Sequence, residues 1–361
     1  MIKKRSKKKL ILIILLCVVV LLIGGWGVLC ANIYDENFNV RGDSYEPLML
    51  RLEDFNRLQC TEYSFSSDKG QKLAGYLYSA GKDPRGIVVI AHGFGGGGHN
   101  SYMDCANYFA QNGWYVFAYD ATGTDKSEGE GVGGVPQGVI DLEHAITFVE
   151  EQEALSGLPV VLFGHSWGGY SVCSVLTYHP EVKAVIECSG FNRSSDMFES
   201  GGKSQAGSLI YAMTPFVKLY ERFKYGKYAA NTAMDGFAST QAPVMIVHSA
   251  DDDVIEIGYG YDQYYEKYKD DPRFTFIRFE NRGHNEICNN PDDTYKDEFN
   301  AEFDRWLDTL DYDYKADENK ERFIKDKADY ITGHLDHARC SSRLDEDLFA
   351  RFLDFYEKAV E

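Results

Sequence analysis

The sequence predicts an α/β fold in which a mostly parallel central sheet carries helices on both faces. Short, almost wholly apolar runs alternate with segments of helical spacing between about residue 86 and residue 310, a pattern typical of βαβ units. These runs lack the polar–apolar alternation of a half-exposed strand, so they fit strands buried on both sides. The chain has 361 residues, 44% of them hydrophobic and 26% charged, which is enough to bury one large core.

The first thirty residues differ in composition from the rest of the chain, since a basic cluster is followed by a long apolar run. The run from Leu10 to Leu29 carries no charge and is long enough to cross a bilayer core of about 30 Å, with Trp26 near its far end, where an aromatic belt is expected. We therefore expect residues 1–30 to be a cytoplasmic basic cluster and transmembrane anchor, with the rest outside the cell. A cleaved signal peptide is the competing interpretation. The cluster consists of Lys3, Lys4, Arg5, Lys7, Lys8 and Lys9.

Charge and cysteine usage exclude several classes of protein. Without the first thirty residues, 31 basic side chains face 56 acidic ones, a net charge of −25 that argues against nucleic acid as a partner. The cysteines beyond the apolar run include no C-x-x-C pair, so no zinc or redox motif is indicated. His334 and His337 lie three residues apart without a third ligand, which fits a solvated helix face better than a metal site.

The first half of the chain supplies the start of the sheet. Residues 31–60 are expected to form a membrane-proximal connector with a short helix near 48–55, and residues 61–310 to form the α/β domain. A β-hairpin is predicted from the alternation at 61–66 and 73–79 around Asp68-Lys69-Gly70. There follow a buried strand at 86–92, a glycine-rich loop at 93–98, a helix at 101–112, a strand at 114–119 and a helix at 136–151.

The stretch from Val160 to Gly169 is the centre of the predicted site. Four apolar residues read as a buried strand, and Gly164-His165-Ser166-Trp167-Gly168 fits the G-x-S-x-G pattern of a nucleophile elbow. In such an elbow a strand turns sharply into a helix and leaves the serine exposed in a strained conformation, with glycines where side chains would collide. Ser166 is therefore the candidate nucleophile.

The second half continues the alternation with one interruption. Strands are predicted at 182–188, 243–248 and 274–279, with helices at 259–268 and 293–310. Residues 191–241 contain no convincing strand but have amphipathic helical spacing, and we expect them to form a lid over the serine; packing on the sheet alone is the alternative. Residues 311–361 are expected to form a C-terminal helical extension that docks on the domain.

A serine hydroxyl needs a base and the base an orienting acid. His284 is the candidate base, because it follows the late strand at 274–279 through a loop that contains Gly283. The acid is expected in the loop after the strand at 243–248, where Asp251, Asp252 and Asp253 are adjacent. Spacing favours Asp252, with Asp251 and Asp253 as alternatives.

Negative charge that develops on a substrate oxygen needs preorganised donors. The backbone N–H of Trp167 is one candidate, and that of Phe94 in the glycine-rich loop is the other. A phosphate-binding loop is the alternative interpretation of these glycines, but the sequence G-x-x-x-x-G-K-[ST] is absent from the chain.

These motifs together resemble the α/β-hydrolase superfamily, in detail its bacterial branch of serine-aminopeptidase-like and lysophospholipase-like hydrolases. The resemblance covers roughly residues 62–310 and departs from the usual glycines at Asp125 and Ser249. It is carried by His92-Gly93-Phe94-Gly95, the elbow, His248-Ser249-Ala250-Asp251-Asp252, Gly283-His284 and the loop from Asp120 to Ser127.

The resemblance implies a two-step acyl transfer by Ser166, His284 and Asp252 through an α/β-hydrolase fold, without a cofactor or metal. We therefore expect a membrane-anchored serine hydrolase that acts on carboxylic esters of small or lipid-like acyl groups. A peptidase is the first alternative, in which acidic lid residues such as Glu199 would hold a substrate amine. A binding or scaffold protein that keeps the fold without turnover is the second.

Overall fold

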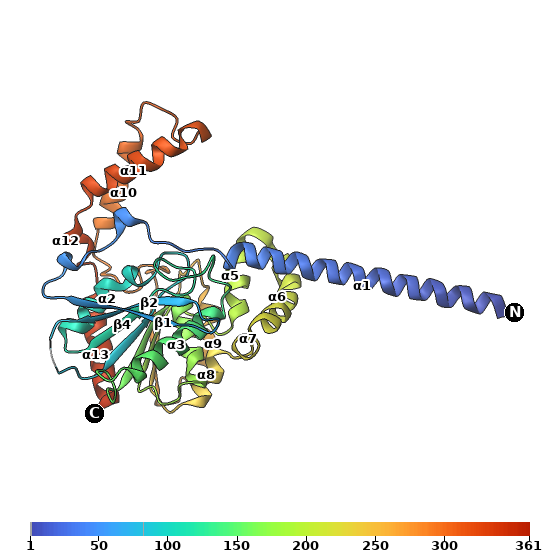
Figure 1. Cartoon of the computed structure of the whole chain (residues 1–361), viewed down its shortest axis with the longest axis horizontal. Coiled ribbons are helices and arrows are strands. Elements are labelled where there is room, and N and C mark those ends of the chain that lie inside the picture. The colour runs from blue at the N-terminus through green and yellow to red at the C-terminus, as the bar shows by residue number, and fades with distance from the viewer. Residues whose placement is uncertain (1, 82) are drawn as a thin grey trace.

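The computed structural model describes residues 2–81 and 83–361, with side chains from residue 7 onward (Figure 1). Its described strands form one eight-stranded sheet in the order β1-β2-β4-β3-β5-β6-β7-β8. The first two strands run antiparallel to their neighbours and the others pair in parallel, which confirms the mostly parallel sheet. The strands are β1 (Gln59–Ser66), β2 (Lys72–Ser79), β3 (Ile87–Ala91), β4 (Tyr115–Tyr119), β5 (Val160–His165), β6 (Val185–Cys188), β7 (Val244–Ser249) and β8 (Phe274–Phe279).

The central strands are buried on both faces, as the apolar runs predict. Every residue of β3 and β5 is buried, and their register pairs Val89 with Leu162. Val89 belongs to one hydrophobic cluster while its neighbours Val88 and Ile90 belong to a second one on the other face. Alternate side chains of one strand therefore serve two cores, which is why the sequence shows no period of two there.

Helices cover both faces of the sheet (Figure 1). The cluster around Val89 is covered by α3 (Gln137–Glu151), α4 (Trp167–Ser174), α8 (Ala233–Ser239) and α9 (Tyr261–Tyr268). The cluster around Val88 is covered by α2 (Met103–Gln111) and α13 (Glu346–Val360).

The last helix of the C-terminal region, α13, is part of the domain core. Phe349, Phe352 and Tyr356 of α13 are fully buried in the core, and the Tyr356 hydroxyl donates a 2.7 Å hydrogen bond to the carbonyl of Leu162 in β5. The projecting part is instead an arm made by α10 (Tyr295–Leu307) and α11 (Lys320–His334), followed by the short α12 (His337–Cys340) (Figure 1). An apolar stripe indicates that a helix is covered, but not which surface covers it.

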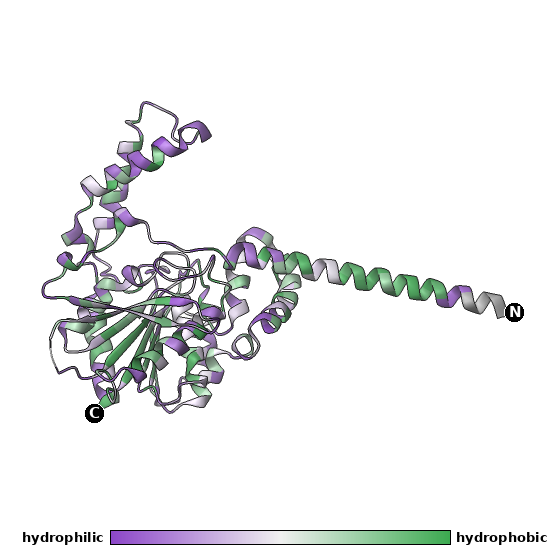
Figure 2. Cartoon of the chain, in the orientation of Figure 1, coloured by the Kyte–Doolittle hydropathy of each residue, from purple (hydrophilic) through white to green (hydrophobic). Residues whose placement is uncertain are grey.

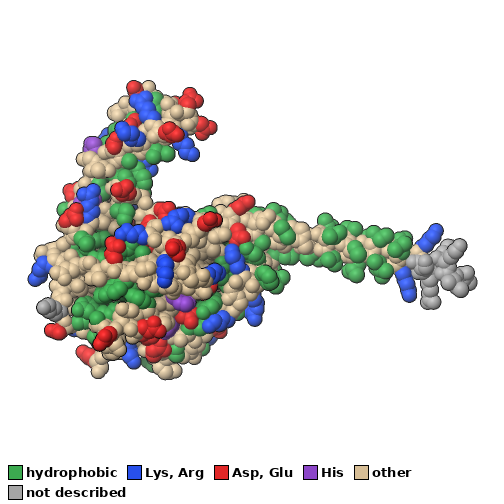
Figure 3. Space-filling model, viewed as in Figure 1, with side chains coloured by type: hydrophobic (Ala, Val, Ile, Leu, Met, Phe, Trp, Pro, Cys, Tyr) green, Lys and Arg blue, Asp and Glu red, His purple; other side chains and the backbone are tan. Residues whose placement is uncertain are grey.

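The N-terminal helix α1 (Ile2–Phe38) extends beyond the predicted boundary at residue 30 and projects from the domain (Figure 1). In the described part of the chain it is the one helix long and apolar enough to span a membrane, with a mean hydropathy of 3.0 over its most apolar 18 residues (Figure 2). Apolar side chains cover it up to its junction with the domain (Figure 3). The side chains of Lys3, Lys4 and Arg5 in the predicted basic cluster lie outside the described residues.

The end of α1 is part of the folded domain. Cys30, Tyr34 and Phe38 are buried, and α1 packs against α6 (Ile210–Tyr225), where Phe216 lies against Gly27. The insertion at 191–241 is helical as predicted, and besides α6 it contains α5 (Ser194–Ala206), α7 (Lys227–Ala230) and α8. In place of the helix expected near 48–55 the connector has two 3₁₀ turns, Glu46–Leu48 and Leu52–Asp54.

Candidate active site

Ser166 occupies the sharp turn between β5 and α4. Its backbone dihedral angles are φ 56° and ψ −117°, a strained conformation for a residue with a side chain. The flanking glycines make the turn possible: a Cβ at Gly164 would lie 2.3 Å from the carbonyl oxygen of Gly168, and a Cβ at Gly168 1.9 Å from that of Ala91. The Ser166 N–H donates a 2.8 Å hydrogen bond to the carbonyl of Cys188, which ties the elbow to β6.

The structure brings together the three side chains predicted from distant motifs. The Ser166 Oγ lies 2.8 Å from Nε2 of His284, and Nδ1 of His284 lies 2.8 Å from Oδ2 of Asp252. They come from the turns and loops that follow β5, β8 and β7, so all three lie at the carboxyl edge of the sheet. An Nδ1–H donated to the carboxylate leaves Nε2 as an acceptor that faces the hydroxyl.

Asp252 is the one of the three adjacent aspartates that contacts His284. Its Oδ1 accepts hydrogen bonds from the N–H groups of Val254 and Ile255, at 3.0 and 2.8 Å. Burial alone would raise the pKa of Asp252, but the hydrogen bonds from His248 and His284 outweigh it and hold that pKa well below its usual range.

The other two aspartates do not face the imidazole. Asp251 accepts hydrogen bonds from the Ser249 hydroxyl and from the N–H of Gly283, and Asp253 is exposed. Asp251 thereby fastens the two loops to each other, while Asp252 alone remains to orient the His284 ring.

Sequence reasoning missed a second imidazole that supports the first. His165, adjacent to Ser166, has Nε2 3.0 Å from the carbonyl of His284 and Nδ1 2.8 Å from the hydroxyl of Tyr102. That hydroxyl accepts a 3.0 Å hydrogen bond from the N–H of Gly93, so it donates its own proton to Nδ1 of His165. With Nδ1 as acceptor, the ring carries its proton on Nε2 and donates it to the carbonyl of His284. Burial lowers the pKa of His165 to about 3, so its ring is neutral in this network.

The two predicted oxyanion donors have suitable surroundings. Trp167 is the first residue of α4, where N–H groups have no acceptor within the helix. Phe94 follows Gly93, whose carbonyl lies 2.7 Å from Nδ1 of His92, while Nε2 of His92 accepts from the N–H of Ala121. Burial lowers the pKa of His92, so its ring is neutral and Nδ1–H donates to the Gly93 carbonyl. In a planar trans peptide the N–H points opposite to the C=O, so the Phe94 N–H points away from His92.

Asp125, which stands where the family that the chain resembles usually has glycine, has a structural role. With φ 42° it adopts the left-handed conformation of the glycine it replaces. Its carboxylate accepts hydrogen bonds from the Ser44 hydroxyl at 2.6 Å and from the N–H of Gly98 at 2.8 Å. Asp125 therefore joins the connector to the glycine-rich loop that carries Phe94.

A cavity of about 640 Å³ opens beside Ser166 and His284. The predicted lid contributes one described lining residue, Met197, because α6 packs against α1 instead of over the serine. Glu199, considered as an amine-binding residue, is absent from the described lining. Besides the glycine-rich loop, the residues just after it and the loop around His284, the walls come from the connector and from segments near the C-terminus, neither of which carries a motif. They include Ser44, Tyr45, Leu48, Met49, Leu50, Ile287, Cys288, Cys340, Arg343 and Leu344.

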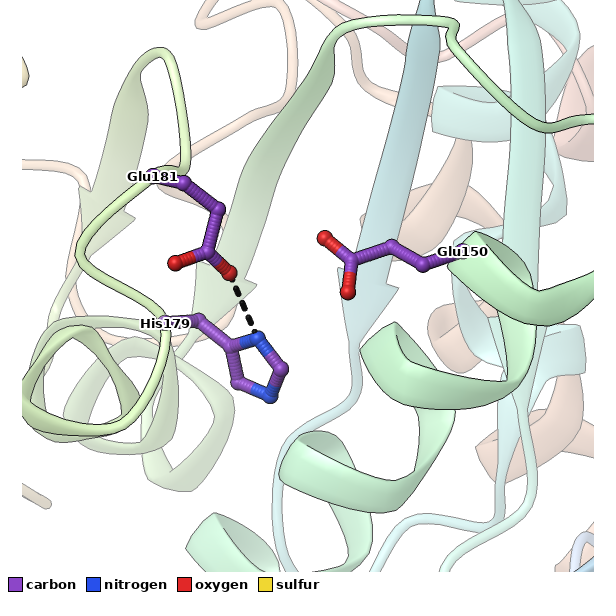
Figure 4. Close-up of side chains that lie close together, drawn as sticks. All are labelled: Glu150, His179 and Glu181. Atoms are coloured by element: carbon purple, nitrogen blue, oxygen red, sulfur yellow. Dashed lines mark hydrogen bonds and ion pairs between the residues drawn. The ribbon is translucent and has the colours of Figure 1, made fainter.

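One group of candidate metal ligands lies elsewhere, at the end of α3 and in the loop before β6. The ligand atoms of Glu150, His179 and Glu181 lie within 4.8 Å of one another, and Nδ1 of His179 is 2.8 Å from Glu181 (Figure 4). A hydrogen bond between the His179 ring and the Glu181 carboxylate accounts for this contact. His334 and His337 do not share a site, since their Nδ1 atoms face the Tyr330 carbonyl and Asp54 respectively.

The known proteins that this chain resembles are hydrolases. Residues 82–223 match the family model described as serine aminopeptidase, S33. A monoacylglycerol lipase of Mycolicibacterium smegmatis is 30% identical over 138 residues, a match that covers 36% of this chain and 46% of the lipase. The chain thus spans less than half the length of this curated relative.

The solved structures that resemble this chain include an esterase of Pyrococcus furiosus. One crystal form aligns with a TM-score of 0.52 at 14% identity over 75% of this chain and 97% of the esterase. A second crystal form gives 0.51 at 14% identity over 75% and 96%. At this identity the likeness is one of fold.

Proposed function

Since the chain belongs to the α/β-hydrolase superfamily, we propose that it is a serine hydrolase that cleaves carboxylic esters through an acyl-enzyme intermediate. The observation that carries this proposal is the continuous hydrogen-bonded line from Ser166 through His284 to Asp252. In the proposed roles these residues are nucleophile, general base and orienting acid.

The proposed reaction has two acyl-transfer steps. Ser166 Oγ attacks the ester carbonyl while Nε2 of His284 takes the hydroxyl proton, and Asp252 stabilises the imidazolium that forms. The N–H groups of Trp167 and Phe94 bind the oxyanion. His284 then gives the proton to the leaving alkoxide, which departs as an alcohol. Water attacks the acyl-enzyme with the same base and releases the carboxylic acid and the free serine.

The cavity supports an apolar acyl group as part of the substrate. Its lining beside the serine contains apolar side chains from six segments, and its volume lies within the range typical of small-molecule sites. We infer a small or lipid-like acyl ester as the substrate. The apolar residues concerned are Phe94, Leu48, Met49, Leu50, Met197, Val254, Ile287 and Leu344.

A peptidase is the second candidate, favoured by the serine aminopeptidase model over residues 82–223. Such an enzyme would need an acidic group to hold the substrate amine. Glu286 lines the cavity, but it is already paired with Lys296 and with Arg343 at 2.5 Å. Asp104 also lines the cavity, and its carboxylate already accepts the N–H of Cys105. Because both carboxylates are engaged within the chain, we favour the ester.

We further propose that α1 remains attached as a single-pass membrane anchor, with the catalytic domain outside the cell. Its polar and tight contacts to α6 support retention, since the Trp26 Nε1–H lies 3.5 Å from the carbonyl of Ala212 and Gly27 packs on Phe216. A signal peptidase cut near residue 30 would remove these contacts. The mass of the chain recovered from membranes distinguishes the two outcomes.

A substrate panel tests the proposed activity. The full chain in detergent is assayed with p-nitrophenyl esters of two to twelve carbons and with aminoacyl p-nitroanilides, beside Ser166→Ala. Hydrolysis of the esters that is lost in Ser166→Ala supports the esterase. Preference for the anilides would favour the peptidase, and a folded protein inert toward both would favour the scaffold alternative.

A further inference from the structure

The helix α6 of the insertion at 191–241 has an exposed face on which large apolar side chains gather. Phe223 is 90% exposed and Leu219 68%, and beyond α1 these are the two most exposed large apolar side chains of the described residues. Tyr211 and Pro215, also exposed, precede them at intervals of four residues, so the four side chains lie along one side of the helix. We call this side the outer face of α6. Exposed apolar groups gathered in this way mark a surface that a partner covers.

The other sides of α6 are packed on the domain and on α1. Met213 and Val217 are buried in the core. Phe216 lies against α1, with a ring carbon 3.3 Å from the position of a Cβ on Gly27. The outer face therefore continues the apolar surface of α1 and has no cover among the described residues.

The contacts with α1 place α6 at the level where the apolar run of α1 ends. Trp26 Nε1 lies 3.5 Å from the carbonyl of Ala212, in the first turn of α6. At about 1.5 Å per residue, the uncharged run from Leu10 to Leu29 is as long as a bilayer core is thick. An α1 that crosses a bilayer therefore holds α6 at the bilayer surface. Figure 1 shows α6 at the end of the domain from which α1 projects.

The charges of α6 suit an anionic surface. Lys218 and Arg222 are exposed and each directly precedes a residue of the outer face. Glu221, the single acidic residue of α6, is 1% exposed and its carboxylate is hydrogen-bonded inside the domain. The chain as a whole has a net charge of −19. This helix thus presents basic and apolar groups to solvent on a protein that is otherwise strongly acidic.

We propose that the outer face of α6 docks on the surface of the bilayer that α1 spans. Its apolar side chains lie at the boundary between headgroups and acyl chains, and Lys218 and Arg222 lie against lipid phosphates. Helices with aromatic and aliphatic residues on one side and lysine or arginine beside them bind membrane interfaces in this way. The domain is then attached at two places, α1 and α6, which fixes the side that it turns to the membrane. This inference rests on the proposed anchor.

Charge argues against a second copy of the chain as the partner of this face. In a twofold dimer the same surface of both copies is used. Such a pairing brings Lys218 and Arg222 of one copy close to the same residues of the other. These like charges repel each other, whereas lipid phosphates neutralise them.

Fluorescence quenching by brominated lipids tests the docking with the full chain in vesicles of phosphatidylcholine and phosphatidylglycerol. Leu219→Trp places a fluorophore on the outer face, and Ile324→Trp on the arm, where the isoleucine is 54% exposed, is the matched control. The unchanged chain gives the signal of the native tryptophans, which is subtracted. Leu219→Trp is expected to lose roughly half of its added emission or more, because it lies at the acyl boundary. Ile324→Trp is expected to keep its emission.

The lipid charge tests the basic pair. In vesicles of phosphatidylcholine alone, the quenching of Leu219→Trp is expected to be weaker, because the attraction to anionic headgroups is lost. Adding Lys218→Gln and Arg222→Gln to Leu219→Trp is expected to lower the quenching in the mixed vesicles to that same level. Equal quenching in the two kinds of vesicle would refute the role given to this pair.

Flotation of the vesicles on a density gradient separates the docking from the anchor. If the chain floats and Leu219→Trp is quenched no more than Ile324→Trp, the docking is wrong while the anchor stands. If the chain does not float, both are wrong. Emission of Leu219→Trp that is already blue-shifted in detergent and depends on protein concentration would identify a second copy as the partner and overturn the docking. If Leu219→Trp does not fold, Tyr211→Trp takes its place with the same expected quenching.

Discussion

The Tyr102 hydroxyl lies 2.8 Å from Nδ1 of His165, and through that ring it supports the loop of the candidate base. The same hydroxyl accepts the N–H of Gly93 at the start of the glycine-rich loop. One side chain, at the end of the 3₁₀ turn His99–Tyr102 that precedes α2, therefore joins the elbow, the base loop and the oxyanion loop. Their relative positions are set together, although they are more than sixty residues apart in the chain.

Replacing Tyr102 with phenylalanine tests this link. The Gly93 N–H and His165 Nδ1 both lose a partner, so we expect a loss of about 1–3 kcal/mol in the free energy of unfolding and a lower kcat. Urea unfolding and ester hydrolysis measure the two effects. Tyr108→Phe, in the helix α2 that follows, is the control, because the Tyr108 hydroxyl forms no hydrogen bond to the described residues. Equal losses in both variants would contradict the assigned role.

The three adjacent aspartates give a sharp comparison. Asp252→Asn is expected to lower kcat by roughly 10³–10⁴-fold, because an amide no longer holds the His284 tautomer or stabilises its charge. Asp253→Asn, at an exposed position, is expected to stay within about threefold. Steady-state kinetics on one p-nitrophenyl ester decides the matter, and a comparable loss at position 253 would refute the assignment.

The C-terminal helix is expected to be required for folding. Phe352 is fully buried against Phe163, and Phe352→Ala should cost about 3–5 kcal/mol in the free energy of unfolding. The control is Ile324→Ala on the arm, where the isoleucine is 54% exposed and a change within about 0.5 kcal/mol is expected. Chemical denaturation compares them. Similar effects at the two positions would mean that α13 is as peripheral as the arm.

Glu221 predicts a dependence of stability on pH. It accepts hydrogen bonds of 2.6 Å from Tyr34 of α1 and from Ser194, and burial raises its pKa to about 7 despite them. The folded state therefore binds a proton that the unfolded state has released between pH 4.5 and 7. Stability should fall by up to about 3 kcal/mol as the pH rises through this window and level off above it.

Glu221→Gln is expected to flatten this slope. Asp196, with a pKa raised by burial to about 6, and Glu187, raised to about 7, contribute in the same direction, so part of the slope remains. Melting temperatures from pH 4.5 to 8 provide the comparison. An identical slope in Glu221→Gln would show that this carboxyl does not bind the proton.

The sheet and the three reacting side chains could be predicted because their signals are local. The apolar run before Gly164 and the elbow pentapeptide each occupy a few consecutive residues. The loops after β7 and β8 each contain a residue suited to the reaction, Asp252 and His284 respectively. Even there, three adjacent aspartates could not be separated by spacing alone. The separation came from hydrogen bonds that depend on where β7 ends and how the loop after it folds.

The segments that cover the site and the residues that support it could not be predicted, because their signals are not local in the sequence. Tyr102 belongs to no motif, and its contacts to Gly93 and His165 arise from the packing of elements distant in sequence. The insertion at 191–241 has the amphipathic spacing of a lid, yet spacing does not reveal that α1 occupies its apolar side. Similarly, the stripe on α13 does not identify the sheet face that it covers.

The central claim is that Ser166 is a nucleophile activated by His284. A fluorophosphonate probe applied to the full chain, followed by peptide mass spectrometry, tests it most directly. We predict one adduct on the peptide that contains Ser166, a rate of labelling that falls by orders of magnitude in His284→Ala, and no adduct in Ser166→Ala. A correctly folded chain that stays unlabelled, or an adduct on a different serine, would contradict the account.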